Sequence, residues 1–173
     1  KIVEEEDIPK SIPRGRLGVH DKDLLNYSVE VMRDIKLPFF AVIFTLSSHS
    51  PYDQPMDGVK DIVKWGGDNN AYLNSVKYSD YSLGIFFDRI KREKWYDNTL
   101  FILVADHSHP TYKGYPLQTF EYHHIPMLFY GKVLKDSLRG KSNDVITSQV
   151  DIPKTILKQL SIDSRDFKWS RDI

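Results

Sequence analysis

The chain has 173 residues, of which 40% are hydrophobic and 28% are charged, and its 24 basic side chains balance 24 acidic ones. This composition is typical of a globular domain and lacks the basic excess of a nucleic-acid binder, so we expect no nucleic-acid partner. The longest apolar run, from Pro38 to Leu46, is about half as long as a membrane span. Cysteine is absent, which excludes disulfides and thiolate metal sites.

The first sixteen residues are rich in charge and contain Pro9 and Pro13, a pattern typical of a loop or linker. We therefore expect residues 1–16 to connect to the main unit rather than to belong to it. Residues 1–10 lack the apolar core of a signal peptide, and the chain does not begin with Met. We interpret the sequence as a fragment of a longer protein.

Three elements are predicted in the first half of the chain. Apolar residues at helical spacing predict a helix over 23–32, which Asp21 or Asp23 can cap. The continuous apolar run over 39–46 predicts a strand buried on both faces, as in a parallel sheet. A long helix is expected over 71–95, with one apolar face formed by Leu73, Val76, Leu83, Phe87 and Ile90.

The second half predicts further strands and one more helix. Apolar runs over 99–105 and 125–130 favour strands, and a short strand is expected around Val145 and Ile146. Asp151 is placed to cap a helix that has Pro153 in its first turn. This order indicates an α/β fold with a mostly parallel sheet covered by helices, in which ligands lie beyond the carboxyl ends of the strands.

Two loops at such strand ends carry residues suited to chemistry. Asp106 and His107 follow the strand over 99–105, and a carboxylate beside an imidazole can bind zinc or manganese. His49 follows the strand over 39–46 and could contact an anionic oxygen, act as a general acid or bind a metal. The alternatives are a structural Asp–His hydrogen bond in the first loop and an exposed loop histidine in the second.

The other histidines are interpreted as structural. His123 and His124 precede a predicted strand, and we expect an ordinary loop role for them. His20 is expected to be structural or exposed. The sequence contains no GxSxG, no phosphate-binding glycine loop and no HExxH.

Four segments in this order resemble the C-terminal half of the sulfatase/alkaline-phosphatase superfamily, in its lipoteichoic-acid-synthase-like branch. They are the run from Phe44 through Thr45-Leu46-Ser47-Ser48-His49 to Tyr52, the stretch from Tyr72 to Asp106-His107, the run from Ile125 to Gly131, and the run from Ser148 to Leu157. The resemblance covers most of residues 18–173. It implies that residues 17–173 are the C-terminal part of a sulfatase-like catalytic domain with an alkaline-phosphatase-like α/β fold.

The resemblance also implies roles for individual residues. Asp106 and His107 correspond to two ligands of a catalytic divalent metal, which could be manganese, zinc, calcium or magnesium. His49 corresponds to a histidine that contacts the phosphate or sulfate group, and His109 is a further candidate for the same anion. One departure is Ser108, where the family commonly has glycine.

The family carries its nucleophile and an acidic metal ligand in an N-terminal part that nothing in this sequence matches. The resemblance therefore implies a fragment that is inactive alone and belongs to a membrane-anchored parent with an extracytoplasmic catalytic domain. The parent would transfer or hydrolyse phospho- or sulfo-esters through a covalent intermediate, with phosphoglycerol transfer favoured. Expected partners are a phosphoglycerol lipid or a sulfated or phosphorylated glycan, the N-terminal remainder of the parent, and a second copy of the fragment. The alternative is a non-catalytic module that binds an anion or another chain.

Overall fold

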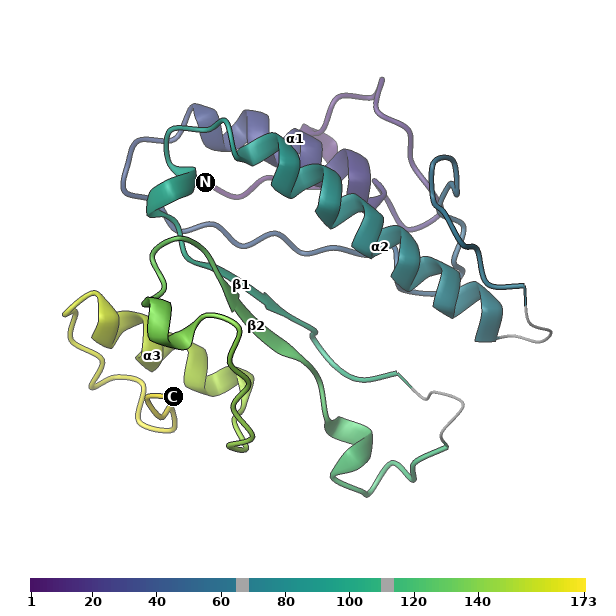
Figure 1. The fold of residues 1–173 in the computed structure, drawn as a ribbon. Helices are drawn as coiled ribbons and strands as arrows, with labels where there is room; N and C mark the ends of the chain where they lie inside the picture. The colour runs from purple at the N-terminus through teal and green to yellow at the C-terminus, as the bar shows by residue number, and fades with distance from the viewer. Residues whose placement is uncertain (65–68, 110–113) are drawn as a thin grey trace. The chain divides into compact units, whose positions relative to one another are not determined.

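A computed structural model describes residues 1–64, 69–109 and 114–173 (Figure 1). The chain divides into two compact units, one formed by Lys1–Asp97 with Pro110–Pro116 and the other by Asn98–His109 with Leu117–Ile173. The helices α1 (Asp21–Arg33) and α2 (Asn69–Ile90) belong to the first unit, after a short 3-10 turn at Glu5–Asp7. The strands β1 (Phe101–Val104) and β2 (Met127–Tyr130) and the helix α3 (Ile152–Gln159) belong to the second.

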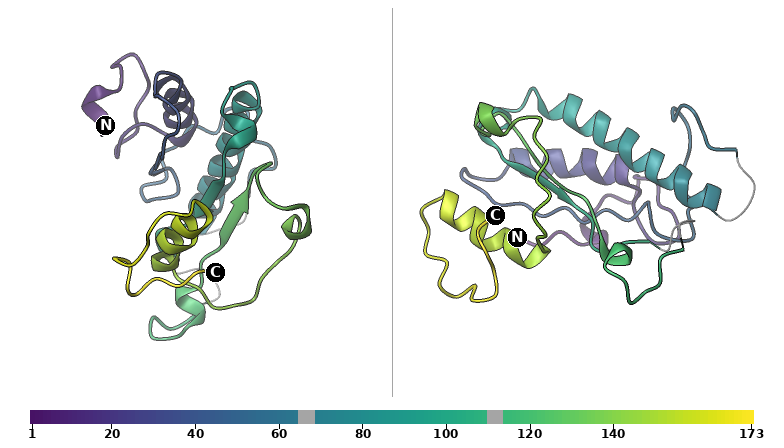
Figure 2. Two further views of the ribbon diagram at one scale, coloured as in Figure 1. Left: turned by 90° about the vertical axis from the view of Figure 1, so that its left-hand side faces the viewer. Right: turned by 60° about the horizontal axis from the view of Figure 1, so that its bottom comes forward.

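The first unit is built on α1 and α2, which lie side by side (Figures 1 and 2). On α1 the buried apolar residues Leu25, Val29 and Met32 are spaced by four and three positions, as an amphipathic helix requires. Polar bonds also join the two helices, since the Arg89 guanidinium donates to the Asn26 carbonyl at 2.9 Å. The helix predicted over 23–32 is therefore confirmed, and it extends two residues further at its start and one at its end.

The buried face of α2 differs from the predicted apolar stripe. The buried residues are Ser75, Tyr78, Ser82, Phe86 and Ile90, whereas Val76 is 42% exposed. The two serines can be buried because their hydroxyls donate to helix carbonyls, at 2.6 Å from Ser75 to Tyr72 and 2.7 Å from Ser82 to Tyr78. Because the two serine side chains are small, a neighbouring segment can pack closely against this face of α2. Close packing therefore favours burial of this face over burial of a face chosen by hydrophobicity alone.

The strand predicted over 39–46 is wrong for this chain. Those residues are not assigned to any strand, and the side chains of Phe40, Val42 and Phe44 are 70–78% exposed. Apolar side chains alone do not make a strand, because a strand needs a neighbour to accept and donate its backbone hydrogen bonds. Within the described residues this segment has no strand beside it. Self-association of the fragment, through a sheet edge and an apolar face that lack their flanking strands, stays a prediction.

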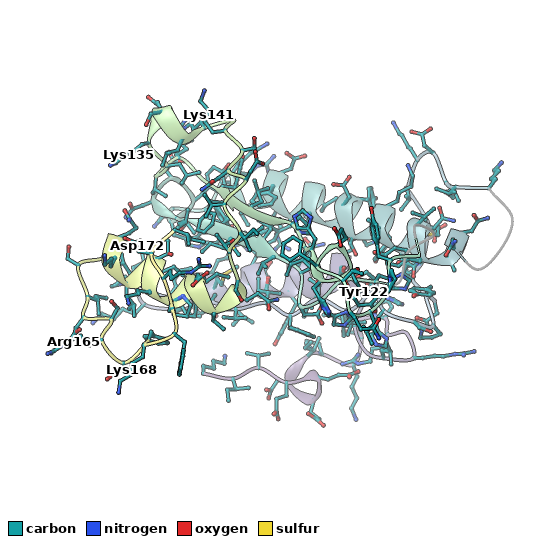
Figure 3. All side chains as sticks on the ribbon, turned by 90° about the horizontal axis from the view of Figure 1, so that it is seen from below. Tyr122, Lys135, Lys141, Arg165, Lys168 and Asp172 are labelled. Carbon is teal, nitrogen blue, oxygen red and sulfur yellow. The ribbon has the colours of Figure 1, made fainter. Side chains whose placement is uncertain are left out.

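The second unit holds an antiparallel pair of strands. The register pairs Phe101 with Tyr130 and Val104 with Met127. Short 3-10 turns at Glu121–His123, Asp136–Leu138 and Gln149–Asp151 lie in the connections, and the last of these leads directly into α3. After α3 the chain folds back along it, where the Lys158 ammonium lies 3.3 Å from the Asp172 carboxylate. Figure 3 shows Asp172 beside α3, while Arg165 and Lys168 project from the outer side of the loop.

The expected strands over 99–105 and 125–130 are confirmed in shorter form, and the α/β class is confirmed. Two details of the expectation are not met. The sheet that the described residues form is a two-stranded antiparallel one, rather than mostly parallel. Val145 and Ile146 are 61% and 64% exposed and lie outside any strand. As with residues 39–46, an apolar run without a neighbouring strand has nothing to pair with.

No helix in the described ranges combines the length and the apolar character that crossing a membrane requires.

Candidate metal and anion-binding residues

Asp106 and His107 lie in a bend of the chain, here called the Asp106–His107 turn, one residue after the end of β1. One carboxylate oxygen of Asp106, Oδ1, accepts the backbone N–H of His107 at 2.8 Å. The other, Oδ2, lies 3.5 Å from Nε2 of His107. Both side chains are more than half exposed, so the carboxylate and the imidazole present one oxygen and one nitrogen to the outside from the same turn.

The hydrogen bonds of His107 determine which ring nitrogen is free to bind a ligand. Nδ1 lies 2.6 Å from the carbonyl oxygen of Ser108. Since a carbonyl only accepts, Nδ1 must carry the hydrogen, and the lone pair of the neutral ring is then on Nε2. Metal-bound histidines are commonly fixed in this way, by donation of the other ring N–H to a backbone carbonyl.

The spacing of the two donors fits a divalent metal. Metal–ligand distances of about 2.1 Å in tetrahedral geometry place neighbouring donor atoms roughly 3.4 Å apart, close to the 3.5 Å between Asp106 Oδ2 and His107 Nε2. Two ligands do not complete such a site. The parts of the chain that the structure describes contain no group of three or more histidine and acidic side chains placed to hold a metal, so Asp106 and His107 fit one half of a metal site.

Gln149 supports this turn from a distant part of the sequence, in a role that sequence reasoning missed. Its side-chain nitrogen lies 2.6 Å from the Ala105 carbonyl and 2.9 Å from the Asp106 carbonyl. The run from Ser148 to Leu157 carried part of the family resemblance, but a single glutamine in it gives no signal of a contact more than forty residues away.

Asp151 is a second residue whose role near the candidate site sequence reasoning missed. It stands at the N-cap of α3, as predicted, but its carboxylate does not cap that helix. The carboxylate accepts the backbone N–H groups of Ser148 at 2.9 Å and Arg171 at 2.7 Å, and the Arg171 guanidinium at 2.9 Å. Hydrogen bonds from Arg171 are the main reason that the pKa of Asp151 is lowered to about 2. Asp151 is 1% exposed, so this ion pair closes the C-terminal segment over the start of α3.

His49 lies in the first unit, on the loop that follows residues 39–46. Its Nδ1 donates to the Ser50 carbonyl at 2.6 Å, so its Nε2 faces outward in the same way as that of His107. Its backbone N–H donates to the Leu46 carbonyl at 3.0 Å, which makes a tight turn through buried Ser47. His49 itself is exposed and available to a ligand.

Asp21 fixes the start of the His49 loop. Its Oδ1 accepts the N–H groups of Leu46 at 3.0 Å and Ser47 at 2.8 Å, and its Oδ2 accepts the Ser79 hydroxyl at 2.7 Å. Its own N–H donates to the Ser47 hydroxyl at 2.9 Å. Asp21 or Asp23 was predicted as the helix cap, but the N-cap position is His20. The Asp21 carboxylate instead binds the loop, a contact that helix-capping rules do not reveal.

The remaining candidate histidines fall into two groups. His109 is half-buried in the second unit, two residues after His107, and its role toward an anion stays a prediction. His123 Nε2 lies 2.8 Å from the Leu117 carbonyl and His124 stacks on Phe120, so both have the ordinary loop roles expected of them. His20 is 5% exposed and packs edge-on against Tyr78, which confirms a structural position.

The structure brings together Asp106 and His107, with Gln149 behind them. His49 belongs to the other unit, and its participation in one site with Asp106 and His107 stays a prediction. Asp106 and His107 present an oxygen and a nitrogen 3.5 Å apart at the end of a strand in an α/β fold, and their role as metal ligands stays a prediction.

The family model described as Sulfatase matches residues 2–162, and the chain therefore belongs to the sulfatase family. Among curated relatives it is 23% identical over 178 residues to lipoteichoic acid synthase-like YvgJ of Bacillus subtilis, covering 90% of this chain and 28% of that protein. It is also 23% identical over 168 residues to lipoteichoic acid synthase of Staphylococcus aureus (strain USA300), covering 87% of this chain and 25% of the relative. The chain thus spans about a quarter of the length of these relatives.

Two solved structures have the same fold. A protein in the alkaline phosphatase superfamily from Vibrio parahaemolyticus matches with a TM-score of 0.80 and 35% identity, over 98% of this chain and 40% of that one. The lipoteichoic acid synthase LtaP from Listeria monocytogenes matches with a TM-score of 0.71 and 19% identity, over 92% of this chain and 43% of that one. These matches confirm the alkaline-phosphatase-like fold expected from the sequence.

Proposed function

We propose that this chain is the C-terminal part of a metal-dependent enzyme that transfers phosphoglycerol from a lipid to an acceptor. The observation that carries the proposal is the pair of outward-facing donors 3.5 Å apart, Oδ2 of Asp106 and Nε2 of His107, each with its other side tied to the backbone. Membership of the sulfatase family and the lipoteichoic acid synthases among the relatives support ester transfer as the reaction class.

In this proposal two residues hold the metal and two others bind the substrate. Asp106 and His107 hold a divalent cation, which could be manganese, zinc, calcium or magnesium. When bound, that cation supplies positive charge that lowers the pKa of a hydroxyl nucleophile and stabilises charge on the ester oxygens. His49 binds the phosphate or sulfate group through its exposed Nε2, and His109 assists from the Asp106–His107 loop.

The covalent part of the reaction needs a residue from outside this chain. A nucleophile and an acidic metal ligand are contributed by the N-terminal remainder of the parent protein. The nucleophile displaces the lipid alcohol from phosphorus, and an acceptor alcohol then displaces the nucleophile. Residues 1–173 alone are therefore expected to bind metal weakly and to show little or no turnover.

The substrate and the location are proposed from the resemblance to the lipoteichoic-acid-synthase-like branch. A phosphoglycerol lipid is the favoured substrate, with sulfated or phosphorylated glycans as the alternatives. The domain is proposed to act outside the cytoplasm, on a membrane-anchored parent.

The test compares variants of the full-length protein that contains this chain. Metal content is measured by elemental analysis, and affinity by calorimetry with Mn²⁺ and Zn²⁺, in wild type, Asp106→Ala and His107→Ala. The proposal predicts that both variants lose at least tenfold in metal affinity and lose transfer of phosphoglycerol. His123→Ala is the matched control, because His123 is an exposed loop histidine in the same unit.

The outcomes separate the proposal from its rivals. Metal binding that survives in Asp106→Ala and His107→Ala would refute the assigned ligands. The two variants could lose metal binding while the wild-type protein turns over a sulfate ester and not a phosphoglycerol lipid. That outcome would support the metal role and replace the proposed substrate. Absence of turnover in a protein that still binds phosphate or sulfate would favour the non-catalytic anion-binding module.

A further inference from the structure

Gln149 makes the contact on which this inference rests. Its amide nitrogen has two hydrogens, and the two acceptors, the carbonyls of Ala105 and Asp106, lie at 2.6 and 2.9 Å. β1 ends at Val104, so these carbonyls lie beyond its pairing with β2. One side chain therefore satisfies two consecutive backbone acceptors at the point where the Asp106–His107 turn begins.

Two consecutive carbonyls held by one nitrogen constrain the backbone more than a single bond would. The direction of each carbonyl fixes the peptide plane next to it, so the planes on both sides of the Asp106 Cα are oriented. The orientation of these planes determines where the Asp106 carboxylate points and where His107 begins. Mutation of groups that hydrogen-bond to metal ligands and orient them typically lowers metal affinity roughly tenfold to a hundredfold.

Gln149 is itself held in place by the segment around Asp151. The backbone N–H groups of Ser148 and Asp151 are both bonded within the 3-10 turn, to the Asp151 carboxylate at 2.9 Å and the Ser148 carbonyl at 2.9 Å. The Arg171 guanidinium closes on the same buried carboxylate and also donates to the Ile146 carbonyl at 3.0 Å. The turn that carries Gln149 is therefore fixed on both sides of the residue.

We propose that Gln149 is a positioning residue for the metal half-site, acting through the carbonyls of Ala105 and Asp106, and that the Asp151–Arg171 pair orients Gln149. This inference rests on the proposed metal role of Asp106 and His107. Gln149 does not touch the metal or the substrate. Its loss leaves both ligands in the chain and lets their turn adopt other conformations.

The decisive variant is Gln149→Met, which keeps the length of the side chain and removes both N–H donors. In the full-length protein we expect its affinity for Mn²⁺ and Zn²⁺ to fall about tenfold to a hundredfold, as measured by calorimetry. The unfolding temperature of the metal-free protein should stay close to that of wild type. Gln159→Met is the matched control, since Gln159 is exposed at the end of α3, and it should leave the affinity unchanged.

A second variant separates hydrogen bonding from packing. Gln149→Glu keeps the shape of the side chain but places carboxylate oxygens against the two carbonyls, so it should weaken metal binding at least as much as Gln149→Met. Gln149→Asn retains the amide on a shorter stem and should recover part of the affinity. Recovery in Asn but not in Glu supports the hydrogen-bond role, whereas equal affinities in Met, Glu and Asn would overturn it.

Failure of this inference can be told apart from failure of the proposed function. Normal metal affinity in Gln149→Met, together with its loss in His107→Ala, overturns the positioning role and leaves the metal ligands in place. Metal binding that is unaffected in His107→Ala overturns the proposed function itself. Unfolding of both Gln149→Met and Gln149→Glu before metal is added would make Gln149 a structural residue and overturn the positioning role.

Discussion

Each unit of the chain uses one buried aspartate to fix a segment that leads to a candidate functional histidine. Asp21 in the first unit and Asp151 in the second are both 1% exposed. Asp21 binds the start of the His49 loop directly. Asp151 acts through an intermediate, because it fixes the turn that carries Gln149, which in turn holds the backbone of Asp106.

The two aspartates differ in how their charge is compensated. The hydrogen bonds to the Asp21 carboxylate come from two backbone N–H groups and one hydroxyl, all of them neutral. Asp151 has backbone N–H groups as well, but it also pairs with the Arg171 guanidinium. Neutral donors and a guanidinium both hydrogen-bond a buried carboxylate, but only the guanidinium also compensates its negative charge. The comparison predicts that Asp21 holds its segment mainly through the geometry of its hydrogen bonds, whereas Asp151 also depends on its charge.

The largest effect is expected from removal of the Asp21 carboxylate. Asp21→Ala leaves two backbone N–H groups and the Ser79 hydroxyl without their acceptor, and it should lower the free energy of unfolding by roughly 3–5 kcal/mol. Urea unfolding of the full-length protein measures this loss. Asp23→Ala is the control on the same helical turn, and a cost of about 0.5 kcal/mol is expected from the helix dipole alone.

The matched variant Asp21→Asn sharpens the interpretation. Its side-chain carbonyl can still accept from Leu46 and Ser47, so it should cost clearly less than Asp21→Ala. Equal losses for Asn and Ala would mean that the negative charge, rather than acceptor geometry, holds the His49 loop, and the contrast with Asp151 would disappear.

The local parts of the fold could be predicted from sequence, because they depend on neighbouring residues. Helical spacing in 23–32 and the Asp-x-Pro start of α3 each identify a helix from a few positions. The strand over 39–46 was wrong because hydrophobicity indicates burial but does not supply the neighbouring strand that burial requires. The face of α2 was misplaced since Ser75 and Ser82 are buried for their size, which a hydrophobic pattern does not register.

In the candidate site, too, the local features could be predicted from sequence and the long-range contacts could not. Asp106 and His107 are adjacent in sequence, and their placement after a strand was enough to nominate them. The contacts of Asp21 with Leu46, of Gln149 with Asp106, and of Asp151 with Arg171 join residues at least 20 positions apart. Such contacts depend on the folded path of the chain, so no local spacing rule could have revealed them.

A pH-dependent effect on stability is expected for Asp151, the buried aspartate of the second unit. The pKa of Asp151 is lowered to about 2, below the usual aspartate value of about 3.9. The stability from its ionised form is therefore fully present above pH ~4 and is lost as the pH falls toward 2. Arg171→Gln removes the main cause of the lowered pKa. The variant should be less stable than wild type above pH 4, and the difference should shrink toward pH 2.

Urea midpoints measured at intervals from pH 2 to pH 7 test this difference. Arg165→Gln is the control, because Arg165 pairs with the exposed Asp163 carboxylate, two residues away. Its midpoints should stay much closer to those of wild type than the midpoints of Arg171→Gln do, because the pair that lowers the pKa of Asp163 is exposed to solvent. A gap between Arg171→Gln and wild type that stays constant down to pH 2 would show that Arg171 stabilises by packing and not through the charge of Asp151.

A smaller and more selective effect than that of Asp21→Ala is expected from Ser79→Ala. The Ser79 hydroxyl donates at 2.7 Å to the Asp21 oxygen Oδ2, the one that is not bonded to the loop backbone. Its removal should cost about 2 kcal/mol, as for a hydrogen bond to a charged group. Ser75→Ala deletes a hydroxyl that donates at 2.6 Å to the Tyr72 carbonyl within the same helix. That carbonyl is neutral and alanine favours a helix, so Ser75→Ala should cost less than about 1 kcal/mol. A larger loss in Ser75→Ala than in Ser79→Ala would mean that close packing around α2, rather than the Asp21 hydrogen bonds, determines the stability of the first unit.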